Sequence, residues 1–186
     1  MRIGIIVGSI AASSINRKVA NVVASLLPED AEVSFLDFSE LPFYNYELDG
    51  DFPQVGRDWK DSIEAQDGII ILTPEYSRSI PGVLKNALDW SVRPWGQGSF
   101  NGKAVTVMGA SIGASGTAMA QQHLRNILAH FNANVMGQPE TFFHFNPDAF
   151  GADGSLQDEA SLAVLTNFAN ASAAHFSAHA KVAASA

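Results

Sequence analysis

One segment of the chain reads Gly68-Ile69-Ile70-Ile71-Leu72-Thr73-Pro74-Glu75-Tyr76-Ser77. Its first half is apolar and β-branched, which predicts a strand over Gly68–Leu72 that is buried on both faces. Its second half is a polar loop stiffened by Pro74, and a helix-like run over 81–90 follows. Open α/β sheets hold their ligands beyond the carboxyl ends of such strands. The segment therefore predicts both a parallel sheet and the place of a binding site.

The same alternation of strand and helix extends in both directions from this segment. Short apolar runs predict strands at Arg2–Val7, Glu32–Phe38, Ala104–Met108 and between Asn134 and Phe143. Apolar residues at helical spacing predict helices near 15–26, 59–65, 119–131 and 162–176, whereas 41–56 reads as an irregular connection. Five strands separated by helices imply right-handed βαβ units and a parallel sheet with both faces covered. Five units in one small domain favour a flavodoxin-like α/β sandwich with strand order 2-1-3-4-5.

Composition limits the classes of function. The chain has 186 residues and 47% hydrophobic content, which suits one domain over 1–186. Its formal net charge of -8 opposes binding to nucleic acid or to an anionic membrane surface. Without cysteine there can be no disulfide, zinc thiolate site, iron–sulfur cluster or thiol nucleophile, so redox chemistry would need a bound cofactor, and we expect no metal site. The first strand is too short for a signal sequence and no apolar run suits a membrane helix, so we expect a cytoplasmic protein.

The loop after the first strand is a candidate phosphate site. It runs from Gly8 to Asn16 and offers a glycine, hydroxyl groups and an amide at a helix N-terminus. Unpaired backbone N–H groups and the helix dipole favour an anion there, with Ser9, Ser14 and Asn16 as side-chain donors. The loop lacks the lysine of a nucleotide P-loop and the later glycines of a dinucleotide fingerprint, so a monophosphate fits best. The alternative is that these residues only cap a helix, with Ser13, Ser14 or Asn16 as the cap.

The loop after the third strand suits a flat heterocycle. Pro74 fixes one backbone angle, so the following N–H groups can face the carbonyl and nitrogen edge of a ring, while Tyr76 offers an aromatic face. Donors at the pyrimidine end of a flavin would favour the negative charge that reduction places there. Glu75 could be a general base, although a single acid without a partner is more often a helix-start residue or a member of an ion pair.

These motifs together resemble the NADPH-dependent FMN reductases, a family that includes bacterial quinone and chromate reductases. The resemblance rests on Gly8-Ser9 with Ser14-Ile15-Asn16, on Pro74-Glu75-Tyr76, and on Ser79-Ile80-Pro81-Gly82 running into Leu84-Lys85-Asn86-Ala87-Leu88-Asp89-Trp90. It continues through His123-Leu124-Arg125 to Pro139-Glu140, and leaves the tail after about Phe150 without information.

The resemblance implies a flavodoxin-like fold, bound FMN, a dimer or tetramer, and hydride transfer from NADPH or NADH through FMN to a quinone, a flavin or another small acceptor. It places Ser9, Ser14, Ile15 and Asn16 around the FMN phosphate, and Pro74, Glu75, Tyr76 and Ser77 beside the isoalloxazine ring. It also places Ser111 and the stretch from Gly113 to Gly116 on the other side of the ring, and it requires no catalytic acid or base from a side chain.

The chain departs from the family pattern at two positions. Many members have an arginine where this chain has Ala11, and an asparagine where it has Ser77. Loss of the guanidinium removes a charge-assisted phosphate contact of about 1.5–3 kcal/mol, which predicts weaker FMN binding. Arg17 could compensate for this loss or face solvent, and Arg78 could meet the phosphates of the nicotinamide nucleotide or remain a solvated loop cation.

Two other functions compete with the reductase. Gly109-Ala110-Ser111-Ile112-Gly113 matches the G-x-S-x-G elbow of serine hydrolases, with later acids and with His175 or His179 to complete a triad. This interpretation gives the Gly8 and Pro74 loops no role. A non-enzymatic flavin electron carrier or sensor is the second alternative, since an acidic protein can dock on basic redox partners. The spacing of His175 and His179 also resembles a zinc-binding pair, but surface histidines are the simpler interpretation.

Overall fold

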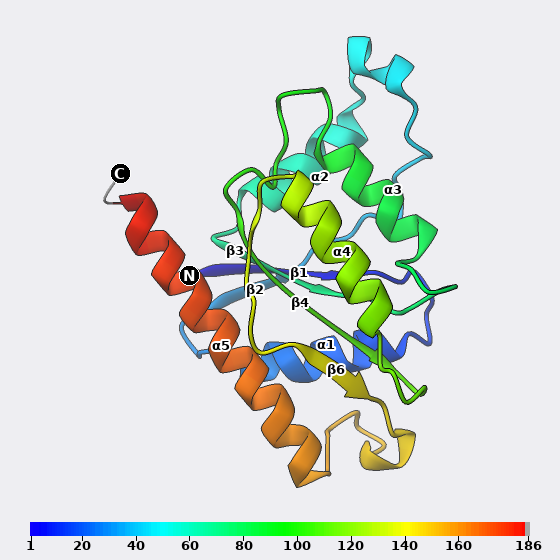
Figure 1. Ribbon diagram of the computed structural model, residues 1–186, viewed down its shortest axis with the longest axis vertical. Coiled ribbons are helices and arrows are strands. Elements are labelled where there is room, and N and C mark those ends of the chain that lie inside the picture. Colours follow the sequence, from blue (N-terminus) through cyan, green and yellow to red (C-terminus); the bar gives the residue numbers. More distant parts are fainter. Residues whose placement is uncertain (185–186) are drawn as a thin grey trace.

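The computed structural model describes residues 1–184. Its centre is a parallel sheet in the order β2 (Glu32–Phe35), β1 (Arg2–Val7), β3 (Gly68–Leu72), β4 (Ala104–Ser111) and β5 (Asn134–Val135) (Figure 1). A further strand, β6 (Thr141–His144), pairs in parallel with the end of β4. The predicted order 2-1-3-4-5 and the flavodoxin-like architecture are confirmed.

Helices cover both faces of the sheet (Figure 1). On one face, α1 (Ile15–Leu26) and α5 (Glu159–Ala184) pack together over a core that includes Ile5, Leu72 and Phe168. On the other face, α2 (Gln54–Glu64), α3 (Gly82–Ser91) and α4 (Ala118–His130) cover a second core that includes Ile71 and Trp90. Because β3 has a helix layer on each face, all its residues are buried, as its continuous apolar run predicts.

Three strand boundaries differ from those expected. The strand β2 ends at Phe35, because the chain then turns at Asp37, whose carboxylate accepts the Ser39 N–H. The strand β4 continues to Ser111, since β6 supplies it with a second parallel partner. The fifth strand, expected between Asn134 and Phe143, is divided into β5 and β6 by the residues around Pro139, which has no N–H for the ladder.

Two less regular segments complete the fold. The expected irregular connection 41–56 carries the short 3₁₀ helix η1 (Tyr46–Asp51) and ends earlier than expected, because α2 begins at Gln54, and Pro147–Ala149 forms a second 3₁₀ helix, η2. The helix α5 is held at the amino end of the sheet, where His175 bonds the carbonyl of Asn134 and His179 bonds that of Gly102. Within residues 1–184, no helix combines the length and the apolar character needed to cross a membrane.

Candidate functional site

Three loops meet at the carboxyl edge of the sheet. In the aligned parallel strands, Val7, Leu72 and Met108 lie side by side. Beyond them, the Gly8 N–H donates to the Leu72 carbonyl at 2.8 Å, and the Thr73 N–H donates to the Met108 carbonyl at 3.0 Å. The structure thus places the predicted loops after β1, β3 and β4 in one region, where α/β sheets bind ligands.

The first loop, Gly8–Ser14, presents backbone donors without acceptors. Ser14 is the N-cap of α1, and its hydroxyl accepts the Arg17 N–H at 3.3 Å. The Ser9 hydroxyl accepts the Ala11 N–H, also at 3.3 Å. In the described part of the chain, no acceptor is bonded to the N–H groups at five positions of this loop and the following helix turn: Ile10, Ala12, Ser13, Ile15 and Asn16. Such an array at a helix N-terminus fits a phosphate group.

The side chain of Asn16 bonds to the protein backbone, whereas the sequence predicts that it contacts a phosphate. It is only 1% exposed, and its amide donates to the Ala110 carbonyl and accepts the Ala110 N–H, both at 2.9 Å. This paired contact joins the start of α1 to the end of β4, which are 94 residues apart in sequence. Asn16 therefore fixes the first loop against the fourth-strand loop, and its backbone N–H is left without an acceptor among the described residues.

The loop after β3, Thr73–Ser79, is closed by a tight turn, and we call it the ring loop because a flat heterocycle is expected beside it. The N–H groups of Tyr76 and Ser79 each donate to the other residue's carbonyl, at 2.9 and 3.0 Å. The two central residues, Ser77 and Arg78, have φ values of 51° and 67°, in the left-handed region. The N–H groups of Glu75, Ser77 and Arg78 have no acceptor among residues 1–184, and the Tyr76 side chain is 55% exposed. These features fit an array of donors beside a flat heterocycle.

Contacts to α4 hold the ring loop in place. The Glu75 carboxylate accepts the N–H groups of Met119 and Ala120 in the first turn of α4, both at 3.1 Å. Glu75 is therefore a helix-start residue, but for α4 and not for the helix that follows it in sequence. The Ser79 hydroxyl also lies 2.7 Å from His123 Nδ1 on α4. Sequence spacing placed His123 on this helix, but no sequence signal connected it to Ser79.

The fourth-strand loop brings Ser111, Gly113 and Gly116 to the same edge. The Ser111 hydroxyl accepts the Gly113 N–H at 3.0 Å. At Gly109, an added Cβ would lie 2.1 Å from both the Thr73 carbonyl oxygen and the Thr117 hydroxyl, so only glycine fits. Gly116 has a φ of 58° and lies against the backbone of Phe142. Close packing thus explains Gly109 and Gly116, whereas no contact of this kind requires a glycine at Gly113.

This geometry does not support a serine hydrolase. The expected histidines, His175 and His179, are bonded to Asn134 and Gly102 at the amino end of the sheet, opposite Ser111. Both are half-buried docking residues of α5, not free surface side chains. The Ser111 hydroxyl makes its one described contact with the Gly113 N–H and lacks the histidine partner that a nucleophile needs.

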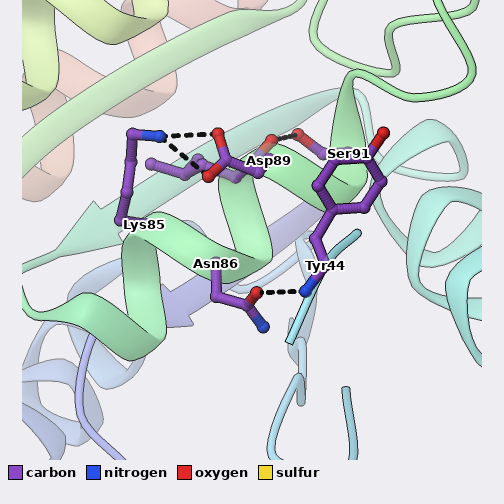
Figure 2. A network of polar contacts seen from close by, with 6 residues as sticks. Tyr44, Lys85, Asn86, Asp89 and Ser91 are labelled. Atoms are coloured by element: carbon purple, nitrogen blue, oxygen red, sulfur yellow. Dashed lines mark hydrogen bonds and ion pairs between the residues drawn. The ribbon is translucent and has the colours of Figure 1, made fainter. Parts of the chain in front are cut away.

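A network on α3 holds the connection after β2 beside the first loop. Figure 2 shows the Asn86 side chain accepting the Tyr44 N–H, at 2.9 Å. The Asn86 amide and the Trp90 indole both donate to the Pro42 carbonyl, at 3.0 and 2.7 Å. An apolar cavity of about 240 Å³ lies here, bordered by Ile10 and Phe43, whose side chains are 61% and 87% exposed. Large exposed apolar groups at the mouth of the site suit an aromatic ligand.

Comparison with known proteins identifies the family. A sequence model of the NADPH-dependent FMN reductases matches residues 1–148, most of the chain. The chain belongs to the NADPH-dependent FMN reductase family. It is 44% identical to a 2-hydroxy-1,4-benzoquinone reductase of a Burkholderia species, over 90% of this chain and 92% of the relative. It is 34% identical to a quinone reductase of Pseudomonas putida, over 84% of this chain and 85% of the relative.

A solved structure agrees with this assignment to the FMN reductases. The flavoenzyme NAD(P)H:(acceptor) oxidoreductase FerB from Paracoccus denitrificans superimposes with a TM-score of 0.91. The two chains share 38% identity, and the match covers 96% of this chain and 98% of FerB. The protein is thus an FMN-dependent oxidoreductase that uses a nicotinamide nucleotide. The free N–H groups of the first loop and the donor array of the ring loop fit the two ends of FMN.

Proposed function

We propose that this FMN reductase converts 1,4-benzoquinones, including hydroxylated ones, to hydroquinones with electrons from NADPH or NADH. The observation that carries the proposal is the 44% identity to a 2-hydroxy-1,4-benzoquinone reductase over nearly the whole chain. The exposed apolar side chains around the site, Ile10, Tyr76 and Ile112, add a physical argument. They would contact a flat aromatic acceptor and contribute affinity without selecting one substitution pattern.

The residues predicted from sequence would divide between the two ends of FMN. The phosphate would be bound by the backbone donors at the start of α1 and by the hydroxyls of Ser9 and Ser14. The ring would lie between two stretches of backbone, Pro74–Ser77 on one side and Ser111, Gly113 and Gly116 on the other. When bound, FMN would supply the hydride acceptor and donor that no side chain of this protein can provide.

Positioning would account for catalysis, without a side-chain acid or base. The Glu75 carboxylate is occupied by two N–H groups of α4, and the Ser111 hydroxyl by that of Gly113. The free N–H groups of Glu75, Ser77 and Arg78 would stabilise negative charge at the ring edge before the reaction begins. An open site would let the nicotinamide nucleotide and the quinone occupy the same place in turn, and solvent would provide the proton that the hydroquinone requires.

We further propose that residues 1–186 act as one FMN-binding domain in a homodimer or homotetramer. Two hydrophobic cores on a single sheet support the one-domain part of this proposal. The cytoplasm is the proposed compartment, because reduced nicotinamide nucleotides are supplied there. Size-exclusion chromatography with light scattering would measure the oligomeric state.

The first test is the visible spectrum of the purified protein after FMN is added and the excess removed. We expect a retained yellow colour that bleaches when NADPH is added without oxygen and returns when 2-hydroxy-1,4-benzoquinone follows, with one hydroquinone formed per NADPH. Turnover with free FMN but not with any benzoquinone would contradict the proposed acceptor. A bleached protein that passes electrons to no small acceptor would instead support an electron carrier.

A further inference from the structure

We propose that Arg17, held in place by the ring of Phe35, is the positive charge that binds the phosphate of FMN. The inference rests on the FMN site argued above, and it assigns a residue outside the loop motifs. Its starting point is that the first loop, Gly8–Ser14, offers backbone donors and hydroxyls but no cationic side chain. A phosphate monoester carries nearly two negative charges at neutral pH, so neutral donors alone leave it poorly balanced.

The position of Arg17 directs it toward this loop. Arg17 is the third residue of α1, and side chains on a helix tilt toward the N-terminus. A cavity of about 470 Å³ is lined by Arg17 together with four residues of the first loop: Ser9, Ile10, Ala11 and Ala12. Ala11 leaves room on the loop side, and Arg17 is the cationic side chain of this cavity.

Phe35 fixes the guanidinium without occupying its hydrogen-bond donors. The Arg17 Cζ atom lies 4.5 Å from the centre of the Phe35 ring, at the end of β2. Stacking of this kind uses the face of the guanidinium and leaves the N–H groups at its edge available. In the part of the chain that the structure describes, no acceptor is bonded to these N–H groups. A half-buried arginine with a fixed plane and free donors is prepared for an anion with several oxygen atoms.

The carboxylate of Asp37 lines the same cavity and already accepts hydrogen bonds from within the protein. Asp37 accepts the Ser39 N–H at 2.9 Å and the Ser39 hydroxyl at 3.1 Å. It makes no ion pair with Arg17, so the charge of Arg17 is not neutralised from within the described residues. The cavity thus contains a cation, Arg17, without an ion-pair partner among the described residues, and an anion, Asp37, whose carboxylate is hydrogen-bonded within its own turn.

The experiment compares FMN with riboflavin, which has the same ring and ribityl chain but no phosphate. Dissociation constants for both are measured by fluorescence quenching in the wild type, Arg17→Ala, Phe35→Leu and Lys18→Ala. Lys18 is the matched control, because it is the next residue of α1, carries the same charge and is exposed. We expect Arg17→Ala to weaken FMN binding about 10- to 100-fold, with riboflavin binding unchanged within about twofold. Phe35→Leu should weaken FMN binding severalfold, and Lys18→Ala should change neither constant.

Three results would overturn the assignment. Equal weakening of FMN and riboflavin would mean that Arg17 supports the fold and not the phosphate. Unchanged FMN binding would remove Arg17 from the site, and a raised KM for NADPH but not NADH with unchanged FMN binding would assign it to the 2′-phosphate of the donor. If Arg17→Ala fails to give a native near-UV spectrum, Arg17→Gln, which keeps most of the side chain, is measured in its place. A wild type that binds neither flavin contradicts the FMN site itself, whereas FMN binding unaffected by Arg17→Ala contradicts only this inference.

Discussion

The first loop and the ring loop lie at the same edge of the sheet, but they are held in different ways. The first loop is tied to the fourth-strand loop through Asn16, one buried side chain that bonds both backbone groups of Ala110, 94 residues away in sequence. The ring loop is fixed by its own turn between Tyr76 and Ser79 and by contacts of Glu75 and Ser79 with α4.

This difference predicts how substitutions in the two loops affect stability and FMN binding. A single buried amide whose partners are backbone groups has no substitute, so its loss should affect stability and FMN binding together. A loop held by several part-exposed contacts should lose them one at a time, with graded effects. The comparison predicts that substitutions behind the phosphate end cause a large loss of stability and that those around the ring cause a small one.

Asn16→Ala should have the largest effect on stability. It leaves the Ala110 N–H and carbonyl buried without partners, and we expect a loss of about 2–4 kcal/mol in the free energy of unfolding. Urea unfolding measures it. Asn170→Ala, at an exposed position of α5, is the control and should change stability by less than about 0.5 kcal/mol. A loss below about 1 kcal/mol for Asn16→Ala would mean that the two loops are not held differently.

Glu75→Ala should have the next largest effect, because two N–H groups at the start of α4 lose their acceptor. We expect a loss of about 1–2 kcal/mol, with a smaller loss for Glu75→Gln, which keeps an oxygen acceptor. Urea unfolding measures the loss of stability, and steady-state rates then measure the turnover of the FMN-loaded variants. The exposed Glu29→Ala serves as control. If Glu75→Gln binds FMN normally but loses more than about a thousandfold in turnover, Glu75 is a general acid or base after all.

Ser111→Ala should change turnover by less than about tenfold, since its hydroxyl supports the Gly113 N–H and takes no part in covalent chemistry. Steady-state rates of the FMN-loaded variant with NADPH and a benzoquinone measure this. A serine-directed phosphonate should leave the wild type fully active. Complete loss of turnover with FMN still bound would restore the nucleophile interpretation.

Ser77→Asn should have the smallest effect and the opposite sign. Ser77 has a φ of 51°, and asparagine adopts the left-handed region more readily than serine. We expect a gain of about 0.5 kcal/mol in the free energy of unfolding, from the urea midpoint at unchanged slope. A loss of stability would show that the Ser77 side chain makes a contribution that the turn geometry does not reveal.

The order of the elements could be predicted from sequence because both helix layers leave continuous apolar runs in the strands. Strand lengths could be predicted less well. The end of β2 depends on the turn that Asp37 and Ser39 make, and the length of β4 depends on β6, whose residues lie 33 positions later in sequence than their partners, as in the pair Ser111 and His144. Pairing over such a distance has no local signal, so the division of the fifth strand around Pro139 was also missed.

The site was predicted at the level of loops and less well at the level of side chains. Backbone donors at the start of α1 follow from a helix N-terminus, which the sequence marks with Ser14. The roles of Asn16 and Glu75 do not follow, because their partners, Ala110 and Met119, are distant in sequence and are contacted through backbone groups that any residue carries. Only the folded structure shows which of these polar side chains already have hydrogen-bond partners within the protein.

Gly109 shows how this architecture limits the evolution of the enzyme. Its missing side chain sets the spacing between Thr73 and Thr117, and a single methyl group there would collide with both at once. Mutation at this position therefore offers no route to a wider or narrower ring site. New acceptors must be accommodated by the exposed residues of the rim, such as Ile10, Tyr76 and Ile112, where side chains can change without moving the sheet. Relatives with different acceptors should accordingly diverge at the rim and retain the glycine.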